Sequence, residues 1–480
     1  MNLAMVFYIL GRVLTCEGVL LLLPLGVSLV YQEWKCVSSF LFTIGLCLLI
    51  GLLLTWRKPA KRVLYVREGF VATALCWMAI SVLGALPFLF SGSITDPVSA
   101  LFETVSGFTT TGASILSNVE ILPKGILFWR SFTHWIGGMG VLVFLLTLLP
   151  LTGGSHVNLM KAESPGPQVE KLVPKVRSTA LILYGIYISL TVLQVLFLFF
   201  GGMPLFDAIT TSFGTAGTGG FGIKNNSMAG YSVYAQVVVT VFMVLFGINF
   251  NFYFLLLMRK FKKALLLEEV RWYLILIAVS ILVIAFNIRG LFDSMGEAVQ
   301  QSAFQVGSII TTTGFATTDF NLWPQTSKTI LVLLMFIGAC AGSTGGGIKV
   351  SRFIILVKTI HKEIKHFLHP QSVGKIAING KPIAHEVLRS VNVFMVTYVL
   401  VFAGSVVLIS FDNLDLTTNF TSVAATLNNI GPGLELVGPT QNFGIFSAGS
   451  KLVLIFDMLA GRLELFPLMI LFTKDTWRRF

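Results

Sequence analysis

Four short segments rich in threonine and glycine could do chemistry through their backbone carbonyl groups. They read TTTGAS at residues 109–114, AGTGGF at 216–221, TTTGFA at 311–316 and, more divergent, NNIGPG at 428–433. Glycine permits backbone angles that turn carbonyl oxygens toward an axis, and rings of such oxygens can replace the hydration shell of a cation. Aligning the segments matches Gly112, Gly219, Gly314 and Gly431. The pattern predicts a cation filter with the candidate residues Thr110, Thr111, Gly112, Thr218, Gly219, Thr312, Thr313, Gly314, Asn429, Ile430 and Gly431.

The stretches that flank these segments have to position them. Each segment follows a short, half-apolar stretch and lies between two longer apolar runs, and successive copies are about a hundred residues apart, which indicates a fourfold internal repeat. A stretch of about ten residues cannot cross a hydrocarbon core of ~30 Å as a helix, so it must enter and return. Irregular backbone at membrane depth is tolerated where it is buried or lines a watery cavity. Four such turns, each at the electronegative carboxyl end of a short helix, therefore predict one cation pore.

The composition predicts that the chain lies in a lipid bilayer. Of the 480 residues, 55% are hydrophobic and 12% are charged, whereas soluble globular domains are about 25% charged. A bilayer accommodates this apolar surface and a water-soluble core does not. The net charge of +12 does not indicate nucleic-acid binding, because the basic residues lie in loops between apolar runs. The five cysteines have no metal-ligand spacing and read as packing residues, and the first apolar run lacks the pattern of a cleavable signal peptide.

The order of the apolar runs predicts an all-α polytopic membrane protein. Residues 1–68 supply two N-terminal transmembrane helices, and four pseudo-symmetric units follow around one pore. Each unit consists of a helix, a re-entrant pore helix with its filter loop, and a second helix. Second spans are expected at 125–151 and 231–258, and the last helix is expected within the apolar run 452–472. The predicted units are residues 69–160, 161–258, 259–368, with a broken second helix, and 369–480.

The distribution of basic residues predicts the orientation. The segments around the four turns are nearly free of lysine and arginine, and every alternate loop is basic. The positive-inside rule places the basic loops in the cytoplasm and the four turns at the outer side. Both termini are then cytoplasmic.

Several longer stretches carry a resemblance to a known family. They are the four turn segments together with WRSFTHWIGGMG (129–140), GACAGSTGGGIK (338–349) and AGRLELFP (460–467). Over essentially its whole length the chain resembles the Trk/Ktr/HKT superfamily of cation transporters, and the two leading spans make it similar to the bacterial TrkH/TrkG branch. The resemblance implies potassium uptake, with permeation of Rb⁺, across the bacterial plasma (inner) membrane. K⁺ is then the transported ion, and no organic cofactor is expected. It also implies a homodimer and a cytosolic TrkA-like nucleotide-binding subunit.

The glycine run after residue 341 suggests a second functional element. Its GxxxxG spacing is that of a phosphate-binding loop, but Ile348 intervenes before Lys349 and no strand precedes it, so nucleotide binding is not indicated. The apolar run 329–341 is too short to span, which predicts a helix broken inside the membrane. The break could be a kink without function. The family resemblance implies instead a loop that gates the pore, made of Gly342, Ser343, Thr344, Gly345, Gly346 and Gly347.

Arg462 lies inside an apolar run. Placing its charge at membrane depth costs free energy unless the guanidinium faces water or a partner. Glu464 is two residues away and faces elsewhere on a helix, so a local ion pair is not expected. A structural pairing or snorkelling would explain the arginine. The family resemblance implies that it points into the pore as an electrostatic barrier, which adds Arg462 to the proposed gate.

The remaining polar candidates are few. Arg130 and His134 lie one helical turn apart, and Glu103 is a candidate partner for Arg130. His361, His366 and His369 read as a solvated or docking surface and less readily as a metal site. No catalytic constellation is present, so the chain is not expected to be an enzyme. A symporter coupled to H⁺ or Na⁺ remains the alternative to a passive pore, and its candidate acids are Asp457 and Glu464.

Overall fold

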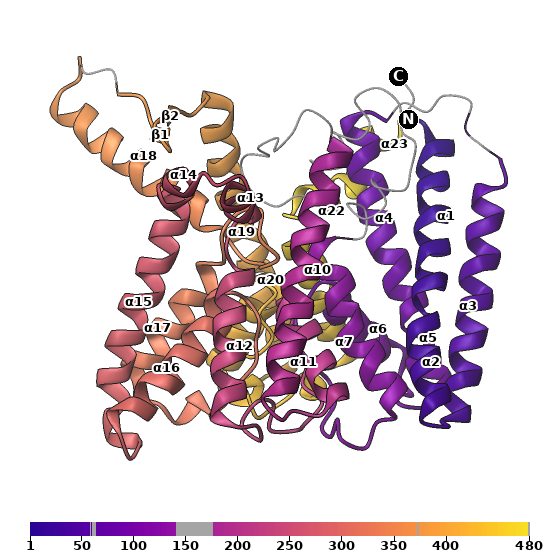
Figure 1. Ribbon diagram of the computed structural model, residues 1–480. Helices are drawn as coiled ribbons and strands as arrows, with labels where there is room; N and C mark the ends of the chain where they lie inside the picture. The colour runs from indigo at the N-terminus through magenta and orange to yellow at the C-terminus, as the bar shows by residue number, and fades with distance from the viewer. Residues whose placement is uncertain (58, 60–63, 141–175, 372–373, 479–480) are drawn as a thin grey trace.

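The computed structural model describes residues 1–57, 59, 64–140, 176–371 and 374–478 and shows a bundle of helices (Figure 1). Within these residues six helical stretches are long and apolar enough to span a membrane, with mean hydropathies of 2.0 to 2.5, and a seventh is possible if one bent pair is a single span. They are α1 with α2 (Leu3–Leu20, Leu22–Val30), α3 (Trp34–Thr55), α4 with α5 (Val66–Gly84, Leu86–Ser91), α10 (Val176–Phe200), α15 (Glu268–Ile288) and α19 (His385–Ile409).

Four shorter helices precede the threonine and glycine segments. They have 12, 12, 16 and 12 residues, or about 18–24 Å of helix, and are therefore too short to cross a core of ~30 Å. They are α6 (Pro97–Phe108), α11 (Leu205–Ala216), α16 (Met295–Ile310) and α20 (Leu416–Leu427).

Side-chain caps fix the start of three of these short helices. Asp96 accepts a hydrogen bond from the Ser99 N–H at 2.8 Å, and Asp415 accepts one from the Thr418 N–H at the same distance. Ser294 caps α16 in the same way. Such caps satisfy amide groups that a helix leaves unpaired at its start. The hydrogen bonds that Ser99 donates also hold the pKa of the exposed Asp96 below its ordinary value.

The second helices of the four predicted units are short in the described residues. These helices have 16, 14, 12 and 15 residues and are α7 (Lys124–Met139), α12 (Val233–Phe246), α17 (Gln325–Phe336) and α21 (Ala448–Arg462). A continuous helix over 231–258 was therefore a wrong prediction, and the apolar run 452–472 does not form one helix either. The first bends by 90° between α12 and α13 (Phe250–Leu257), and the second breaks where Glu464 and Leu465 have φ values of 56° and 68°. Residues 141–151 of the predicted run 125–151 lie outside the described residues.

The other elements lie at the end of the bundle that holds both termini, or connect helices. Beside α14 (Phe261–Leu265), the helix α18 (Val350–Leu368) and a hairpin project from the bundle at that end (Figure 1). The hairpin pairs β1 (Ala377–Ile378) antiparallel with β2 (Lys381–Pro382). The short elements are α22 (Phe466–Met469), α23 (Lys474–Trp477) and the 3₁₀ turns η1 (Arg289–Leu291), η2 (Phe320–Leu322), η3 (Ser410–Asp412), η4 (Glu435–Val437), η5 (Phe443–Ile445) and η6 (Ile470–Phe472).

The outer helices expose large apolar side chains, and aromatic residues fill the interior. Leu53 on α3 and Leu400 on α19 are 63% and 68% exposed, which a water-soluble surface would not tolerate in long rows. In the interior, Trp129 on α7 is fully buried and donates to the Gly84 carbonyl at 3.0 Å. These features are those of a polytopic membrane protein.

Candidate functional site

The four threonine and glycine segments form the same backbone turn at the end of a short helix. In the first turn the Thr110 N–H donates to the Gly107 carbonyl at 3.1 Å and the Thr111 N–H to the Ser106 carbonyl at 2.9 Å. This is the Schellman arrangement, in which a residue in the left-handed region ends a helix. The same pair of bonds recurs in the other turns through Thr218 and Gly219, Thr312 and Thr313, and Asn429 and Ile430.

The residue at the left-handed position of each turn is not glycine. Thr110, Thr218, Thr312 and Asn429 have φ values of 56°, 55°, 59° and 55°. A β-branched threonine is an outlier there, at a cost of order 1–3 kcal/mol. Three of the four turns therefore hold strain that the surrounding packing has to support.

A glycine with positive φ follows two residues later in every turn. The four are Gly112, Gly220, Gly314 and Gly431, with φ values of 78°, 74°, 83° and 102°. The alignment that matched Gly219 with the other glycines is therefore shifted by one residue. Because Thr218 occupies the place of Thr110, Gly219 takes the place of Thr111. Because Gly219 and Gly220 are adjacent, the sequence alone could not show which of them aligns with the glycines of the other turns.

The four turns contact one another in chain order. A Cβ atom added to the glycine of one turn would collide with a carbonyl oxygen of the next turn, and the fourth turn returns to the first. The pairs are Gly112 with the carbonyl of Gly219, Gly220 with that of Thr313, Gly314 with that of Ile430, and Gly431 with that of Thr111. The backbone of the four turns therefore closes a ring.

The fourth turn is fastened by its own side chain. The Asn429 Nδ2 donates to the Thr111 Oγ1 and to the Met458 carbonyl, each at 2.9 Å. Asn429 thus joins the fourth turn to the first turn and to α21. The other three turns carry a threonine at this position and have no such amide.

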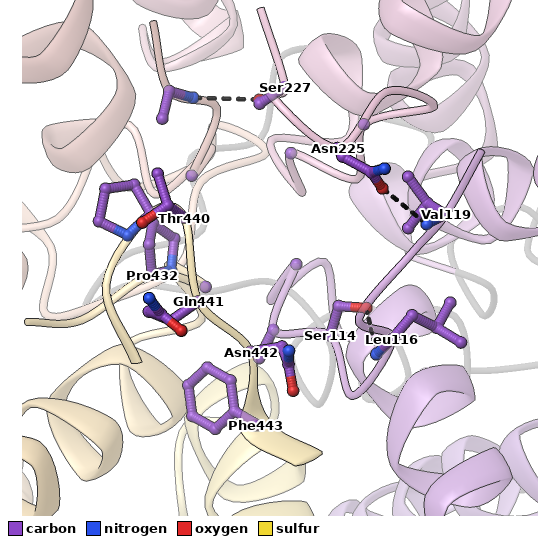
Figure 2. A pocket seen from close by; sticks show the side chains of 18 of the residues that line it. Ser114, Leu116, Val119, Asn225, Ser227, Pro432, Thr440, Gln441, Asn442 and Phe443 are labelled. Carbon is purple, nitrogen blue, oxygen red and sulfur yellow. Dashed lines mark hydrogen bonds between the residues drawn. The ribbon is translucent and has the colours of Figure 1, made fainter. Parts of the chain in front are cut away.

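A polar cavity of about 120 Å³ opens onto the ring and is lined by Gly112, Gly220, Gly314 and Gly431. Figure 2 shows Ser114, Asn225, Gln441 and Asn442 around it, with the Asn225 side chain bonded to the Val119 N–H at 2.8 Å. Hydroxyl and amide groups of this kind can hold water beside the ring carbonyls.

Arg130 and Glu103 form a buried ion pair beside the first turn, as the sequence predicted. The Arg130 Nε lies 2.6 Å from a Glu103 oxygen, and the side chains are 4% and 0% exposed. Glu103 also accepts bonds from the Ser114 hydroxyl and the Ile115 N–H, each at 3.0 Å. Arg130 donates to the Gly222 carbonyl at 2.8 Å, beyond the second turn. The pair therefore braces the first two turns.

Loss of the arginine should destabilise the fold strongly. We expect Arg130→Met to lower the free energy of unfolding by about 3–5 kcal/mol, because it leaves the Glu103 carboxylate buried without its cation. Thermal unfolding of the detergent-purified chain measures the change. Asp475→Asn is the control, since the exposed pair of Arg478 and Asp475 should contribute nothing measurable. Equal melting temperatures for Arg130→Met and wild type would show that the pair does not brace the turns.

His134 joins the first two turns through both ring nitrogens. Its Nδ1 lies 2.7 Å from the Gly107 carbonyl oxygen, and its Nε2 lies 3.2 Å from the Phe221 N–H. A carbonyl requires a donor and an amide N–H an acceptor, so the imidazole is neutral with its proton on Nδ1. A neutral histidine of this kind holds the backbone of the two turns in place and presents no charge to a passing ion.

The glycine run after α17 folds into a loop that closes on the ring. The loop begins and ends side by side, because the Gly338 N–H donates to the Ile348 carbonyl at 2.8 Å. At its tip the Gly346 N–H donates to the Thr312 Oγ1 of the third turn at 2.6 Å. A Cβ on Gly346 would lie 2.7 Å from the Asn428 carbonyl oxygen beside the fourth turn. The loop 342–347 therefore lies directly against two of the four turns.

Glu269 on α15 holds the two ends of this loop. One of its carboxylate oxygens accepts from the Ala341 N–H at 2.7 Å and from the Ser351 N–H at 3.1 Å. The bend after α12 is attached to the same loop, because the Phe250 N–H donates to the Gly342 carbonyl at 3.0 Å. No sequence pattern indicated this role for Glu269, which is 72 residues before Ala341.

The positively charged side chains of Lys349 and Arg462 donate hydrogen bonds to carbonyl groups of the loop. The Lys349 Nζ, which is buried, donates to the Gly346 carbonyl at 3.0 Å and also to that of Gly345. The Arg462 Nη1 donates to the Thr344 carbonyl at 3.0 Å. Its Nη2 donates to the Gly138 carbonyl at 2.9 Å and to the carbonyl of Gly137, at the end of α7. Arg462 therefore links the loop to a helix terminus that favours a cation.

The two acids singled out for ion coupling have partners. Glu464 pairs with Arg352 on α18 at 2.5 Å, across 112 residues, and not with the neighbouring Arg462. Asp457 is fully buried and accepts from the Ser405 hydroxyl at 2.6 Å.

The comparisons with known proteins decide the family. The model of the TrkH family, described as a cation transport protein, matches residues 38–478. The chain belongs to the TrkH family. Among TrkH relatives, the Trk system potassium uptake protein TrkH of Salmonella typhimurium is 39% identical over 470 residues, which cover 95% of this chain and 96% of that protein. The TrkG protein of Escherichia coli is 34% identical over 462 residues, covering 95% and 94%.

The crystal structure of the potassium transporter TrkH from Vibrio parahaemolyticus is similar to the whole chain. Its TM-score is 0.89 at 34% identity, and the match covers 100% of both chains. The TrkH family consists of transporters and not of enzymes, as the sequence predicted. In the described part of this TrkH-family chain no group of three or more His, Cys, Asp or Glu residues could hold a metal ion, and His361, His366 and His369 are exposed on or beside α18.

Proposed function

We propose that this TrkH-family chain conducts K⁺, and Rb⁺ with it, through a pore whose filter is the ring of four turns. The observation that carries the proposal is the closed order of contacts among Gly112, Gly220, Gly314 and Gly431 and the carbonyl groups of the neighbouring turns. Carbonyl oxygens at such a constriction replace the hydration shell of a potassium ion. The relatives from Salmonella typhimurium and Escherichia coli are named as potassium uptake proteins, which supports the choice of ion.

The four units predicted from the sequence give the pore its architecture in this proposal. Each contributes a long helix, a re-entrant helix with its turn, and a shorter second helix, in the order α4–α6–α7, α10–α11–α12, α15–α16–α17 and α19–α20–α21. The recurrence of the same two hydrogen bonds in all four turns supports this reading. The boundary between the first two units, at residue 160, falls outside the described residues.

The loop 342–347 and Arg462 form the gate in this proposal. The loop lies against the third and fourth turns, and Arg462 places a positive charge on its Thr344 carbonyl. A cation that leaves the ring would meet both. Opening requires the guanidinium to release carbonyl groups of the loop or of α7, so movement of α21 or of the loop would admit the ion.

The proposed setting is the inner membrane of a bacterium, with both termini in the cytoplasm and the chain paired in a homodimer. The end of the bundle that holds the termini also carries the basic α14 and α18, which the positive-inside rule assigns to the cytoplasm. The relatives are named as parts of a Trk system, and a cytosolic TrkA-like nucleotide-binding subunit would control the gate from this side.

A symporter driven by H⁺ or Na⁺ is less well supported. Coupling requires a titratable group that alternates between states in the ion pathway, but Glu464 is neutralised by Arg352 and Asp457 lies against Ser405 on α19. Within the described residues, neither carboxylate is hydrogen-bonded to a residue of the four turns. A passive pore needs no such group.

Flux into liposomes tests the proposed function. We expect purified protein, together with its cytosolic partner, to pass K⁺ and Rb⁺ down their gradients, to exclude Na⁺, and to ignore an imposed proton gradient. Asp457→Asn should keep this flux within about twofold of wild type, because the asparagine retains a carbonyl for the Ser405 hydroxyl. Accumulation of K⁺ against its gradient, driven by protons and lost in Asp457→Asn, would establish the symporter.

A further inference from the structure

A large cavity lies apart from the pore, at the end of the bundle where α14 meets the start of α15. It has a volume of about 1020 Å³, at the upper end of the ~300–1,000 Å³ of ligand clefts. Its walls come from the bend formed by α13 and α14, from the first turns of α15, and from the tip of the β1–β2 hairpin. Figure 1 shows α13 and α14 above α15, on the same side as α18.

Four cationic side chains line this cavity. They are Lys260, Lys263, Arg271 and Lys381. Within the part of the chain that the structure describes, none of them has a carboxylate within ion-pair distance. The cavity therefore concentrates positive charge that the protein does not neutralise.

Among the described residues that line the cavity, the one acid is Glu268, and it is already engaged. The Glu268 carboxylate pairs with the Lys358 Nζ at 2.5 Å, and Lys358 also donates to the Ala377 carbonyl at 2.7 Å. The Glu268 N–H donates to the Asn379 side chain at 2.8 Å, which fastens the hairpin tip to α15. These bonds hold Lys381 at the rim and leave the other cations free for an anion.

Apolar side chains make up much of the remaining lining. They are Phe254 and Leu255 on α13, Leu266 and Leu267 after α14, and Trp272 and Ile275 on α15. The Trp272 side chain is 49% exposed one turn from the start of a membrane span that begins at Glu268. Tryptophan is enriched at this depth, where the hydrocarbon meets the headgroups. A soluble phosphate compound has no apolar chain that could pack against these side chains.

We propose that this cavity binds an anionic phospholipid, with its phosphate among Lys260, Lys263, Arg271 and Lys381 and an acyl chain along Trp272 and Ile275. Basic pockets beside membrane spans recognise anionic headgroups in this way. The lipid belongs to the leaflet on the side of the chain termini. The site is separate from the ring of turns and does not depend on which ion passes.

Native mass spectrometry of the full-length protein in detergent tests the site, with phosphatidylglycerol and phosphatidylcholine added separately. We expect at least about tenfold preference for phosphatidylglycerol, and a loss of about 25-fold in Lys263→Gln/Arg271→Gln, since each cation contributes roughly fivefold. The control Arg259→Gln/Lys262→Gln removes the same charge from exposed positions beside the cavity and should stay within about twofold of wild type. Equal binding of the two lipids, or equal loss in both variants, would overturn the proposal.

Two further measurements separate a lipid from other ligands and from misfolding. Glycerol 1-phosphate, the headgroup fragment alone, should not displace phosphatidylglycerol at equal concentration; displacement would assign the cavity to a soluble phosphate. Phosphatidylglycerol with brominated acyl chains should quench wild-type tryptophan fluorescence more than that of Trp272→Phe. The same quenching in both proteins would place the acyl chain elsewhere and refute the site, even if the charge variants fail to fold.

Discussion

Replacing Gly220 with alanine is expected to abolish selective K⁺ flux. Gly220 has a φ of 74°, and an added Cβ would collide with the carbonyl oxygen of Thr313 in the next turn. The left-handed conformation costs alanine about 1–2 kcal/mol, and the collision would push a carbonyl of the proposed filter out of the ring. Rb⁺ uptake into liposomes should fall by at least about tenfold, since 1.4 kcal/mol corresponds to a factor of ten.

The matched control for this substitution is Gly404→Ala on α19. A Cβ on Gly404 would meet no atom within 4 Å, and alanine is favoured over glycine inside a helix. This variant should transport like wild type. If Gly220→Ala takes up Rb⁺ at the wild-type rate and still prefers K⁺ over Na⁺, Gly220 is not part of the filter. The alignment of the second turn on Gly220 would then also be wrong.

Replacing Arg462 with alanine is expected to raise the flux of K⁺ in the absence of the cytosolic partner. The guanidinium holds carbonyl groups of Thr344 in the loop and of Gly138 at the end of α7, and hydrogen bonds of charged groups contribute about 1.5–3 kcal/mol each. Loss of one bond would favour the open loop by about tenfold or more. The leak of Rb⁺ from loaded liposomes measures this change.

Arg462→Lys separates the charge from the bridging role. A lysine keeps the positive charge but lacks the planar fork that reaches two carbonyl groups at once, so its leak should lie between those of wild type and Arg462→Ala. Arg478→Ala, which removes an exposed arginine, is the control and should not leak. If Arg462→Ala melts as wild type does and its flux is unchanged or lower, the arginine is no barrier.

Hydropathy and local spacing were sufficient to predict the membrane class, the short helices and the positions of the turns. Apolar runs of about twenty residues imply spanning helices, and the repeated threonine and glycine segments marked where the chain reverses. The ion pair of Arg130 with Glu103 was also predictable, because both residues flank the first turn and a buried charge needs a partner.

The features that the sequence did not predict depend on backbone angles or on distant contacts. The 90° bend between α12 and α13 leaves hydropathy unchanged, since the residues on both sides remain apolar. The choice between Gly219 and Gly220 depends on which residue adopts the left-handed conformation. The partner of Glu464 is Arg352, and no local rule relates residues that are 112 positions apart.

The contacts of Asn429 give the proposed pore a thermodynamic linkage. Its amide binds Thr111 in the ring and the Met458 carbonyl on α21, one helical turn before Arg462. A displacement of α21 that frees Arg462 must therefore strain or break a bond to the ring. Coupling between two sites is reciprocal, so an ion held in the ring stabilises the closed position of α21 to the same extent that this position stabilises the ion. External K⁺ would thus act as a ligand that resists opening of its own pathway.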